Sequence, residues 1–328
     1  MGTPSVLITG ATGFIGAHVV SRFAEQGTAI RALVRATSDT RALERHGAEL
    51  APGSLTDPES LRRAVRDVDV VVHLAALTSA RSTAEYHRVN ETGTRDLVRA
   101  AVLADPRPRR FVYLSSLAAA GPSIDGEPVR PGDAPRPLTA YGRSKLAGEI
   151  ACQEAAADIE VSILRAPAVY GPGDREMFRF FRMARLGIVP VPAGPDRMLQ
   201  FVHVGDLAGA LVRAALGPAA AGLFHIAEAK AYGGREFARL VGEAVGRQVR
   251  VVTVPAAVLR MAASMNEAAR GVLARSTVFN RDKAEELLAT GWLCETGTAR
   301  DVLGFEAETP LARGLRETAH WYERNRWL

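Results

Sequence analysis

Cysteine is scarce in this sequence: Cys152 and Cys294 are the only two among 328 residues, and neither belongs to a CxxC pair. Two distant thiols exclude a disulfide-stabilised scaffold and a cysteine-based zinc site, and they are typical of a reducing cytoplasm. The seven histidines show no ligand-like spacing either. We therefore predict that the protein binds no metal.

Long apolar runs are also absent, since none approaches the roughly 20 residues of a membrane span. The first strand is expected within the first several residues, which leaves no room for a signal peptide. The net charge is +5 and the isoelectric point about 9.5, but the arginines are scattered and only 6% of residues are aromatic. This pattern argues against nucleic-acid binding. We expect a cytoplasmic protein without a membrane span or a nucleic-acid partner.

The most informative segment that is present covers residues 9–16 and reads TGATGFIG. It follows an apolar run and precedes a helical pattern, which places Gly10, Gly13 and Gly16 at a strand-to-helix turn. Such glycines allow a tight turn, approach of the backbone to a pyrophosphate, and close packing of helix on strand. The helix N-terminus adds unpaired N–H groups that favour phosphate. An ordinary turn is the alternative, but the position at the start of a βαβ unit favours dinucleotide binding.

Strand and helix patterns alternate through the first half of the chain. Strands are expected at residues 5–9, 29–34, 49–51, 70–74, 110–115 and 161–165, and helices at 17–26, 58–65, 91–104 and 141–157. Several of these strands are nearly continuous apolar runs, as expected when helices cover both faces of a sheet. The sequence therefore predicts an α/β fold with a doubly wound, parallel Rossmann sheet and ligands beyond its carboxyl edge.

The sequence changes character after Gly171, where proline and glycine become frequent. A strand at 200–204, a helix at 206–216 and a strand at 223–227 follow, and the remainder is mostly helical. We predict a smaller, mostly helical C-terminal substrate domain. In this division the NAD(P)-binding Rossmann domain comprises residues 1–170 plus about 200–225, and the substrate-binding domain comprises 171–199 and 226–328.

Three residues could carry out acid–base chemistry. Tyr141 and Lys145 lie four residues apart in YGRSK, so one face of the expected helix carries both. A free tyrosine has a pKa near ~10, but a nearby ammonium and an oxidised nicotinamide ring favour the phenolate. Ser116 ends the strand RFVYLSS, where its hydroxyl could hydrogen-bond a substrate oxygen. The structural alternatives are a half-buried aromatic, a solvated helix charge and a strand-end cap.

These motifs resemble the extended short-chain dehydrogenases/reductases, which include NAD-dependent epimerases/dehydratases, 3β-hydroxysteroid dehydrogenases and dihydroflavonol reductases. The matching segments span essentially the whole chain: TGATGFIG, HLAA at 73–76, VNETGT at 89–94, LSS at 114–116, YGRSK, RAPAVYGPGD at 165–174, FVHVGDLA at 201–208 and the terminal GLRETAHWYE. The resemblance implies that Tyr141 is the general acid/base and that Ser116 orients the substrate. It implies that Lys145 binds the nicotinamide ribose and lowers the tyrosine pKa. Ser115 is the adjacent candidate if the register differs by one residue.

The resemblance also implies a set of cofactor contacts. These are Gly10, Thr12, Gly13, Phe14, Ile15, Gly16, Arg35, Ser38, Ser54, Leu55, Leu74, Ala75, Ala76, Asn90, Ser115, Tyr141, Lys145, Pro167 and Val169. Asn90 would lie near the active-site helix, and an amide on the helix surface is the alternative. Ser54 stands where the family commonly has an Asp that contacts adenine, although the backbone of Leu55 can still contact the ring.

The end of the second strand bears on the choice between NAD and NADP. NAD enzymes usually place an acidic residue there, which holds the ribose 2′-hydroxyl. Here Val34 occupies that position and Arg35 follows it. A guanidinium suits a 2′-phosphate, and Ser38 or Arg31 could assist, unless Arg31 is simply a strand-face charge. We therefore predict NADP as the cofactor, with NAD less favoured.

Two features concern the reaction. Ala168 stands where nucleotide-sugar enzymes of the family commonly carry an Asn that holds the substrate diphosphate. The apolar segment 254–265 either suits a hydrophobic substrate or forms a core-facing amphipathic helix. Together with Arg35, these features predict an NADP(H)-dependent oxidoreductase that interconverts a secondary alcohol and a ketone on a small, hydrophobic substrate.

Two other functions stay open at this point. One is an NAD-dependent nucleotide-sugar epimerase/dehydratase, and the other is a catalytically idle NADP-sensing protein. The presence of Ser116, Tyr141 and Lys145 argues against the idle protein. The resemblance further implies a homodimer that forms through the helices expected at 91–104 and 141–157.

Overall fold

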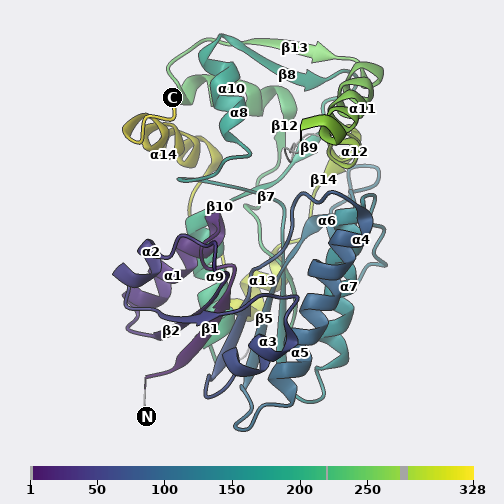
Figure 1. Ribbon diagram of the computed structural model, residues 1–328. Coiled ribbons are helices and arrows are strands. Elements are labelled where there is room, and N and C mark those ends of the chain that lie inside the picture. The colour runs from purple at the N-terminus through teal and green to yellow at the C-terminus, as the bar shows by residue number, and fades with distance from the viewer. Residues whose placement is uncertain (1–2, 219–220, 274–279) are drawn as a thin grey trace.

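A parallel sheet of seven strands forms the centre of the protein, in the order β11-β6-β5-β4-β1-β2-β3 (Figure 1). The computed structural model describes residues 3–218, 221–273 and 280–328. The strands are β1 (Ser5–Thr9), β2 (Ala29–Val34), β3 (Glu49–Pro52), β4 (Val70–His73), β5 (Arg110–Ser116), β6 (Glu160–Ala166) and β11 (Gly222–His225). All neighbouring strands pair in parallel. The predicted doubly wound Rossmann sheet is therefore confirmed.

Successive side chains of a strand point to opposite faces of the sheet, so both faces of this apolar sheet need a cover. Helices provide it on each side. Val6 and Ile8 of β1 belong to the apolar cluster beneath α1 (Phe14–Glu25) and α9 (Val204–Leu216). Leu7 belongs to the opposite cluster. That face is covered by α3 (Pro58–Ala64), α5 (Gly93–Val102) and α7 (Ala140–Glu154), and the short α2 (Arg41–Arg45) follows β2.

The helix expected at 91–104 is longer than its pattern indicates. It begins as α4 (Thr83–Tyr86), continues through a π-helical segment, η1 (His87–Thr92), and becomes α5. π-helical turns are rare and occur often at functional sites. The extra residue in the turn rotates the helix locally, and Asn90 lies within this segment.

The other elements gather at the end of the sheet where β7 (Ala168–Tyr170) directly follows β6 (Figure 1). The exception is α13 (Gly297–Leu303), which packs against α9 and β11. The elements at this end are α8 (Phe178–Arg185), β8 (Ile188–Pro192), β9 (Met198–Leu199), β10 (Phe201–His203), β12 (Tyr232–Gly233), α10 (Gly234–Ala244), β13 (Arg250–Val254), α11 (Ala256–Leu273), α12 (Arg281–Leu288), β14 (Gly291–Trp292) and α14 (Leu311–Arg324). A separate, largely aromatic cluster that includes Phe181, Phe201 and Tyr322 forms their core. The exact division into two domains stays a prediction.

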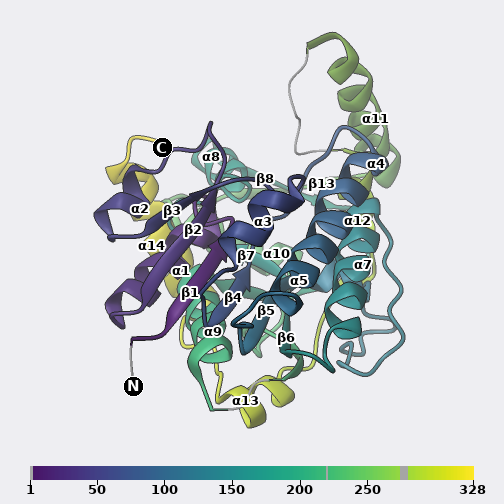
Figure 2. The ribbon, with the colours of Figure 1, turned by 60° about the horizontal axis from the view of Figure 1, so that its bottom comes forward.

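Helix α11 contradicts the expectation of a core-facing helix at 254–265. Val258, Met261 and Met265 form a stripe at helical spacing, and they are 43%, 58% and 66% exposed. Figure 2 shows α11 projecting from the body of the protein. The stripe therefore faces outward, although no helix in the described parts of the chain is long and apolar enough to cross a membrane.

Candidate active site

The predicted site segments meet at one edge of the sheet because each of them follows a parallel strand. Gly10 follows β1, Arg35 follows β2, Leu74 follows β4 and Pro167 follows β6, while Ser116 is the last residue of β5. The carboxyl ends of parallel strands lie at a common edge, where open α/β sheets bind their ligands. The topology thus brings together residues that are up to 157 positions apart.

The glycine turn leaves no space for side chains. Gly10 has a φ of +73°, and a Cβ atom on it would lie 2.8 Å from the backbone nitrogen of Ala75. A Cβ on Gly16 would lie 2.1 Å from the carbonyl oxygen of Gly10. Gly13 caps α1 without a side-chain hydrogen bond, so the first N–H groups of the helix have no side-chain acceptor there. This bare turn at a helix N-terminus fits a dinucleotide pyrophosphate.

Ser116 and Tyr141 come together beside the start of α7. Thr139 caps this helix by accepting a hydrogen bond from the Gly142 backbone at 3.0 Å, which places Tyr141 in the first turn. Ser116 caps the short α6 (Leu117–Ala120), and its Oγ accepts from the Ala118 backbone at 3.2 Å. The Ser116 hydroxyl lies near enough to the Tyr141 hydroxyl to lower the pKa of this tyrosine. The predicted pairing of these two residues is therefore present in the fold.

The protein alone does not make Tyr141 more acidic. Burial raises the pKa of Tyr141 above its ordinary value, and the nearby Ser116 hydroxyl opposes this shift. The negative charges of Glu286 and Glu176 raise the pKa further. The lowering expected from Lys145 and an oxidised nicotinamide ring stays a prediction for the enzyme with cofactor bound.

Lys145 is buried, with only 2% of its surface exposed, so it is not the solvated charge that was the alternative. Its Nζ donates a hydrogen bond to the Leu114 carbonyl at 2.8 Å and lies 4.0 Å from the ring centre of Tyr113. Burial lowers the pKa of Lys145 to about 7, and the charge of Glu149 opposes that shift. Burial and the Glu149 charge therefore act in opposite directions on the protonation of this amine.

Ser115 points to a different place from Ser116. Its hydroxyl donates a hydrogen bond to the Glu149 carboxylate, and its side chain is buried. The alternative register, with Ser115 beside the tyrosine, is not the one observed. A cofactor contact through the Ser115 backbone stays a prediction.

Asn90 is buried, which makes the surface-amide alternative wrong. Its side chain accepts from the Leu77 backbone nitrogen at 2.7 Å and donates to the Leu77 carbonyl at 3.0 Å. It also donates to Ser144 Oγ at 3.0 Å, and Ser144 in turn donates to the Tyr141 carbonyl at 2.7 Å. Asn90 thus connects the loop after β4 to the first turn of α7, which carries Tyr141.

Sequence reasoning missed a buried set of hydrogen bonds centred on His73. The ring contacts Thr9 Oγ1 through Nδ1 at 2.6 Å and Thr94 Oγ1 through Nε2 at 2.9 Å. Thr94 donates to the Asn90 carbonyl, and Thr9 accepts from the Ala75 backbone. These partners assign the proton to Nε2, because Thr94 must accept from the ring while Thr9 donates to it. Burial lowers the pKa of His73 to about 3, so the ring is neutral.

The two arginines considered for a 2′-phosphate differ in their surroundings. Arg31 pairs with Glu49 at 2.9 Å and donates to backbone carbonyls of α3 and the following turn. Arg31 is therefore a structural strand-face charge. Arg35 is exposed, and its guanidinium has no partner among the described residues. Only its backbone is engaged, in a turn with Ser38.

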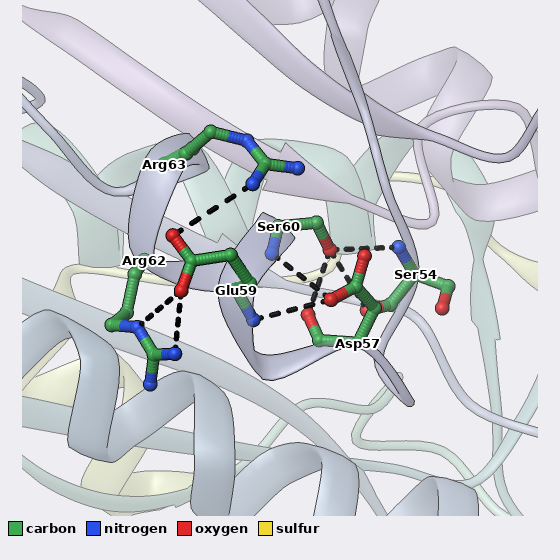
Figure 3. A network of polar contacts seen from close by, with 6 residues as sticks. All are labelled: Ser54, Asp57, Glu59, Ser60, Arg62 and Arg63. Carbon is green, nitrogen blue, oxygen red and sulfur yellow. Dashed lines mark hydrogen bonds and ion pairs between the residues drawn. The ribbon is translucent and has the colours of Figure 1, made fainter.

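The turn after β3 is held by the start of α3 (Figure 3). Asp57 caps this helix by accepting from the backbone of Glu59 and Ser60, and Ser60 Oγ accepts from the Ser54 backbone at 3.2 Å. The Ser54 hydroxyl contacts Thr56 at 3.1 Å. Leu55 faces the core. The turn is thus preorganised, and the adenine contacts of Ser54 and the Leu55 backbone stay predictions.

The remaining predicted cofactor residues line the same edge of the sheet. Their side chains are exposed or half-buried: Thr12, Phe14, Ile15, Leu74, Ala75, Ala76, Pro167 and Val169. The structure places them next to the glycine turn, after β4, and around β7. Their contacts with a nucleotide stay predictions.

Helix α12 supplies acidic groups near Tyr141 that the sequence did not reveal. Asp282 accepts a hydrogen bond from the Ala140 backbone at 2.9 Å, and Glu286 accepts from Thr139 Oγ1 at 3.3 Å. Lys283 pairs with Glu286 at 3.1 Å. No motif links residue 282 to residue 140, so only the fold shows that α12 contacts the start of α7.

The geometry defines a class: a Rossmann enzyme with a dinucleotide turn and a Ser–Tyr–Lys group at the carboxyl edge of its sheet. Residues 6–227 match the NAD dependent epimerase/dehydratase family. The chain therefore belongs to this family of NAD(P)-dependent enzymes. The described residues contain no group of three His, Cys, Asp or Glu that could hold a metal ion.

Known relatives include both reductases and epimerases. The chain is 33% identical over 326 residues to the ceramide reductase of Caulobacter vibrioides, covering 98% of this chain and 96% of that protein. It is 27% identical over 321 residues to a farnesyl dihydroquinoline-oxide ketoreductase of Stigmatella aurantiaca, covering 94% and 93%. UDP-glucose 4-epimerase from Thermotoga maritima has the same fold, with a TM-score of 0.79, 22% identity, and coverage of 98% and 99%. The first two relatives support an oxidoreductase.

Proposed function

We propose that this protein is an NADP(H)-dependent oxidoreductase that interconverts a secondary alcohol and a ketone on a small, hydrophobic substrate. The placement of Ser116, at the carboxyl end of β5, beside Tyr141 in the first turn of α7 carries this proposal. Ser116 would position the substrate oxygen, and Tyr141 would donate a proton to it in the direction of reduction. When bound, the nicotinamide supplies the hydride. Lys145 would hold the ribose and favour the ionised form of Tyr141.

The hydrophobic substrate is supported by two observations. Ala168, which is exposed in β7, has no side-chain amide to hold a diphosphate. Ceramide and a farnesylated quinoline oxide, named for two relatives, are both lipid-like. We therefore propose a ketone attached to an aliphatic or isoprenoid chain as the substrate class.

A screen with purified protein tests this proposal. Thermal-shift measurements with NADP present would compare long-chain 3-keto compounds, sterols and nucleotide sugars, and NADPH oxidation would follow with each compound that stabilises the protein. We expect lipid-like ketones to stabilise the protein and to be reduced. Stabilisation by nucleotide sugars alone would contradict the proposal.

An NAD-dependent nucleotide-sugar epimerase/dehydratase is the second candidate, supported by the fold shared with UDP-glucose 4-epimerase. Analysis of the cofactor that copurifies separates the two. Retained NAD would favour the epimerase, since that reaction regenerates its cofactor, whereas exchangeable NADP favours net redox. An idle NADP sensor would bind the cofactor but turn over no compound in either assay.

The choice of NADP gives a prediction at Arg35. Its free guanidinium would bind the 2′-phosphate through charge-assisted hydrogen bonds worth about 1.5–3 kcal/mol each. Arg35→Ala should weaken NADP binding by about one to two decades, since ~1.4 kcal/mol is tenfold. The affinity for NAD should change much less. Arg41→Ala is the matched control, because Arg41 lies nearby but pairs with Asp39 at 2.5 Å. Equal losses for both cofactors, measured by fluorescence titration, would contradict the assignment.

A homodimer through α5 and α7 is a further part of the proposal. Leu103 at the end of α5 and Ile150 on α7 are 69% and 46% exposed, respectively, although both are apolar. Leu103→Glu combined with Ile150→Glu should convert a dimer into monomers, as measured by sedimentation velocity. Val302→Glu on α13, at an equally exposed apolar residue (50%), should leave the dimer intact. A wild-type monomer would rule out this interface. A cytoplasmic location is also proposed, on the cysteine usage alone.

A further inference from the structure

A row of buried charges lies behind Lys145, outside the residues assigned to substrate or cofactor. Glu149 is one helical turn after Lys145, so both side chains lie on the face of α7 that packs on β5 and β6. Arg165 of β6 donates to Glu149 through Nε at 2.9 Å and Nη2 at 2.6 Å. Ser115 donates to the same carboxylate. All four side chains are less than 5% exposed.

The charge balance of this row is uneven. Lys145 and Arg165 are cations, and Glu149 is the carboxylate whose charge raises the pKa of the lysine most. The other titratable groups around it are neutral. His73 on β4 and His225 on β11 have pKa values lowered by burial to about 3 and about 4. Burial raises the pKa of Tyr113 on β5, and of Tyr141 and Cys152 on α7, above their ordinary values.

The direct contacts of Lys145 are weak partners for a buried cation. The Leu114 carbonyl is uncharged, and the Tyr113 ring offers only its quadrupole. A buried ammonium without a counter-charge loses its proton easily, because the charged form is the one that burial disfavours. The charge of Glu149 acts in the opposite direction and raises the pKa of Lys145.

We propose that Glu149 is a positioning residue for catalysis: its carboxylate, held by Arg165 and Ser115, keeps Lys145 in the ammonium form. The consequence for catalysis rests on the proposed role of Lys145, but the protonation of the amine does not. Arg165 has a double effect. It holds the carboxylate in place, and its own positive charge partly offsets the benefit of Glu149 for Lys145.

The sequence makes a direct measurement practical, because Lys145, Lys230 and Lys283 are its only lysines. Protein labelled with ¹³C at the lysine Cε, without cofactor, would give three signals, and Lys145→Met identifies one of them. We expect the Lys145 signal to titrate near pH 7 in the wild type. Lys230, whose side chain is 58% exposed, is the internal reference.

Two single variants should shift the titration midpoint of Lys145 in opposite directions. Glu149→Gln removes the anion, so the Lys145 midpoint should fall by about one pH unit or more. Arg165→Met removes a neighbouring cation, so the midpoint should rise. A purely structural role would leave both midpoints where they are, and unchanged midpoints in folded protein would overturn the proposal.

A double variant covers the case in which an unpaired buried charge unfolds the protein. Glu149→Met with Arg165→Met removes both charges, and apolar replacement of a buried ion pair is often tolerated. Its Lys145 midpoint should lie below that of the wild type, because the lost anion is only one turn away. A wild-type midpoint would overturn the proposal.

Cofactor binding then tests the consequence. NADPH affinity of Glu149→Gln should fall as pH rises through the lowered midpoint, at a lower pH than for the wild type. If the Lys145 midpoints shift as expected but the NADPH affinity does not follow them, the result would count against the proposed role of Lys145. The two failures are therefore distinguishable.

Discussion

Tyr141→Phe should lose most of its turnover while cofactor affinity stays close to that of the wild type. Only the hydroxyl is removed, and the ring still packs beside Tyr86, with the ring centres 6.1 Å apart. General acid–base catalysis is typically worth about 10²–10⁴-fold, so kcat should fall by that amount. Steady-state NADPH oxidation with the ketone found in the screen measures the loss.

Tyr86→Phe is the matched control for this variant. Tyr86 donates its hydroxyl to the Thr78 carbonyl at 3.2 Å, on the loop that Asn90 also holds. Loss of that hydroxyl should change turnover far less. If Tyr141→Phe retained turnover similar to that of the wild type, the proton donor would have to be another group.

Gly16→Ala should have the second large effect, on both stability and cofactor binding. The added Cβ would lie 2.1 Å from the Gly10 carbonyl oxygen and 2.7 Å from the Ala11 Cα, so the turn must move. Overpacking of this kind costs about 1–3 kcal/mol of unfolding free energy. Because Gly10 belongs to the turn that we expect to bind the cofactor phosphates, cofactor affinity should fall more than tenfold.

Gly209→Ala provides the control. Gly209 lies in α9, where an added Cβ would meet nothing within 4 Å, and alanine favours a helix by about 1 kcal/mol. The stability of this variant should stay equal or rise slightly, and its cofactor binding should not change. Chemical denaturation and cofactor titration of the two variants give the comparison. Equal stability and equal cofactor affinity would show that a Cβ on residue 16 does not disturb the turn.

Much of the fold follows from local sequence patterns. The apolar runs that become β1, β2, β4, β5 and β6 were recognisable because strands covered on both faces require continuous apolar residues. The glycine turn was recognisable because its residues are adjacent in sequence and only glycine suits them. Tyr141 and Lys145 are four residues apart on one helix, so their shared face follows from helix geometry.

The tertiary structure decided those features that depend on partners distant in sequence. It buried Asn90 and rotated it in a π-helical segment, and no local pattern indicates that turn. It bound Arg31 to Glu49 and left Arg35 free, although Arg31 lies within β2 and Arg35 directly follows it.

Burial also changed the chemistry that sequence reasoning assumed. Lys145 has an ordinary pKa in an unfolded chain, and only its enclosure between α7 and β5 lowers that value to about 7. Ser115 and Ser116 are neighbours with the same side chain, but alternation along β5 sends one to Glu149 and the other to Tyr141. Sequence alone therefore determined the sheet, the glycine turn and the choice of candidate reactive residues. Their protonation states and partners were set by the fold, because electrostatic free energies depend on burial and on charges that only folding brings close.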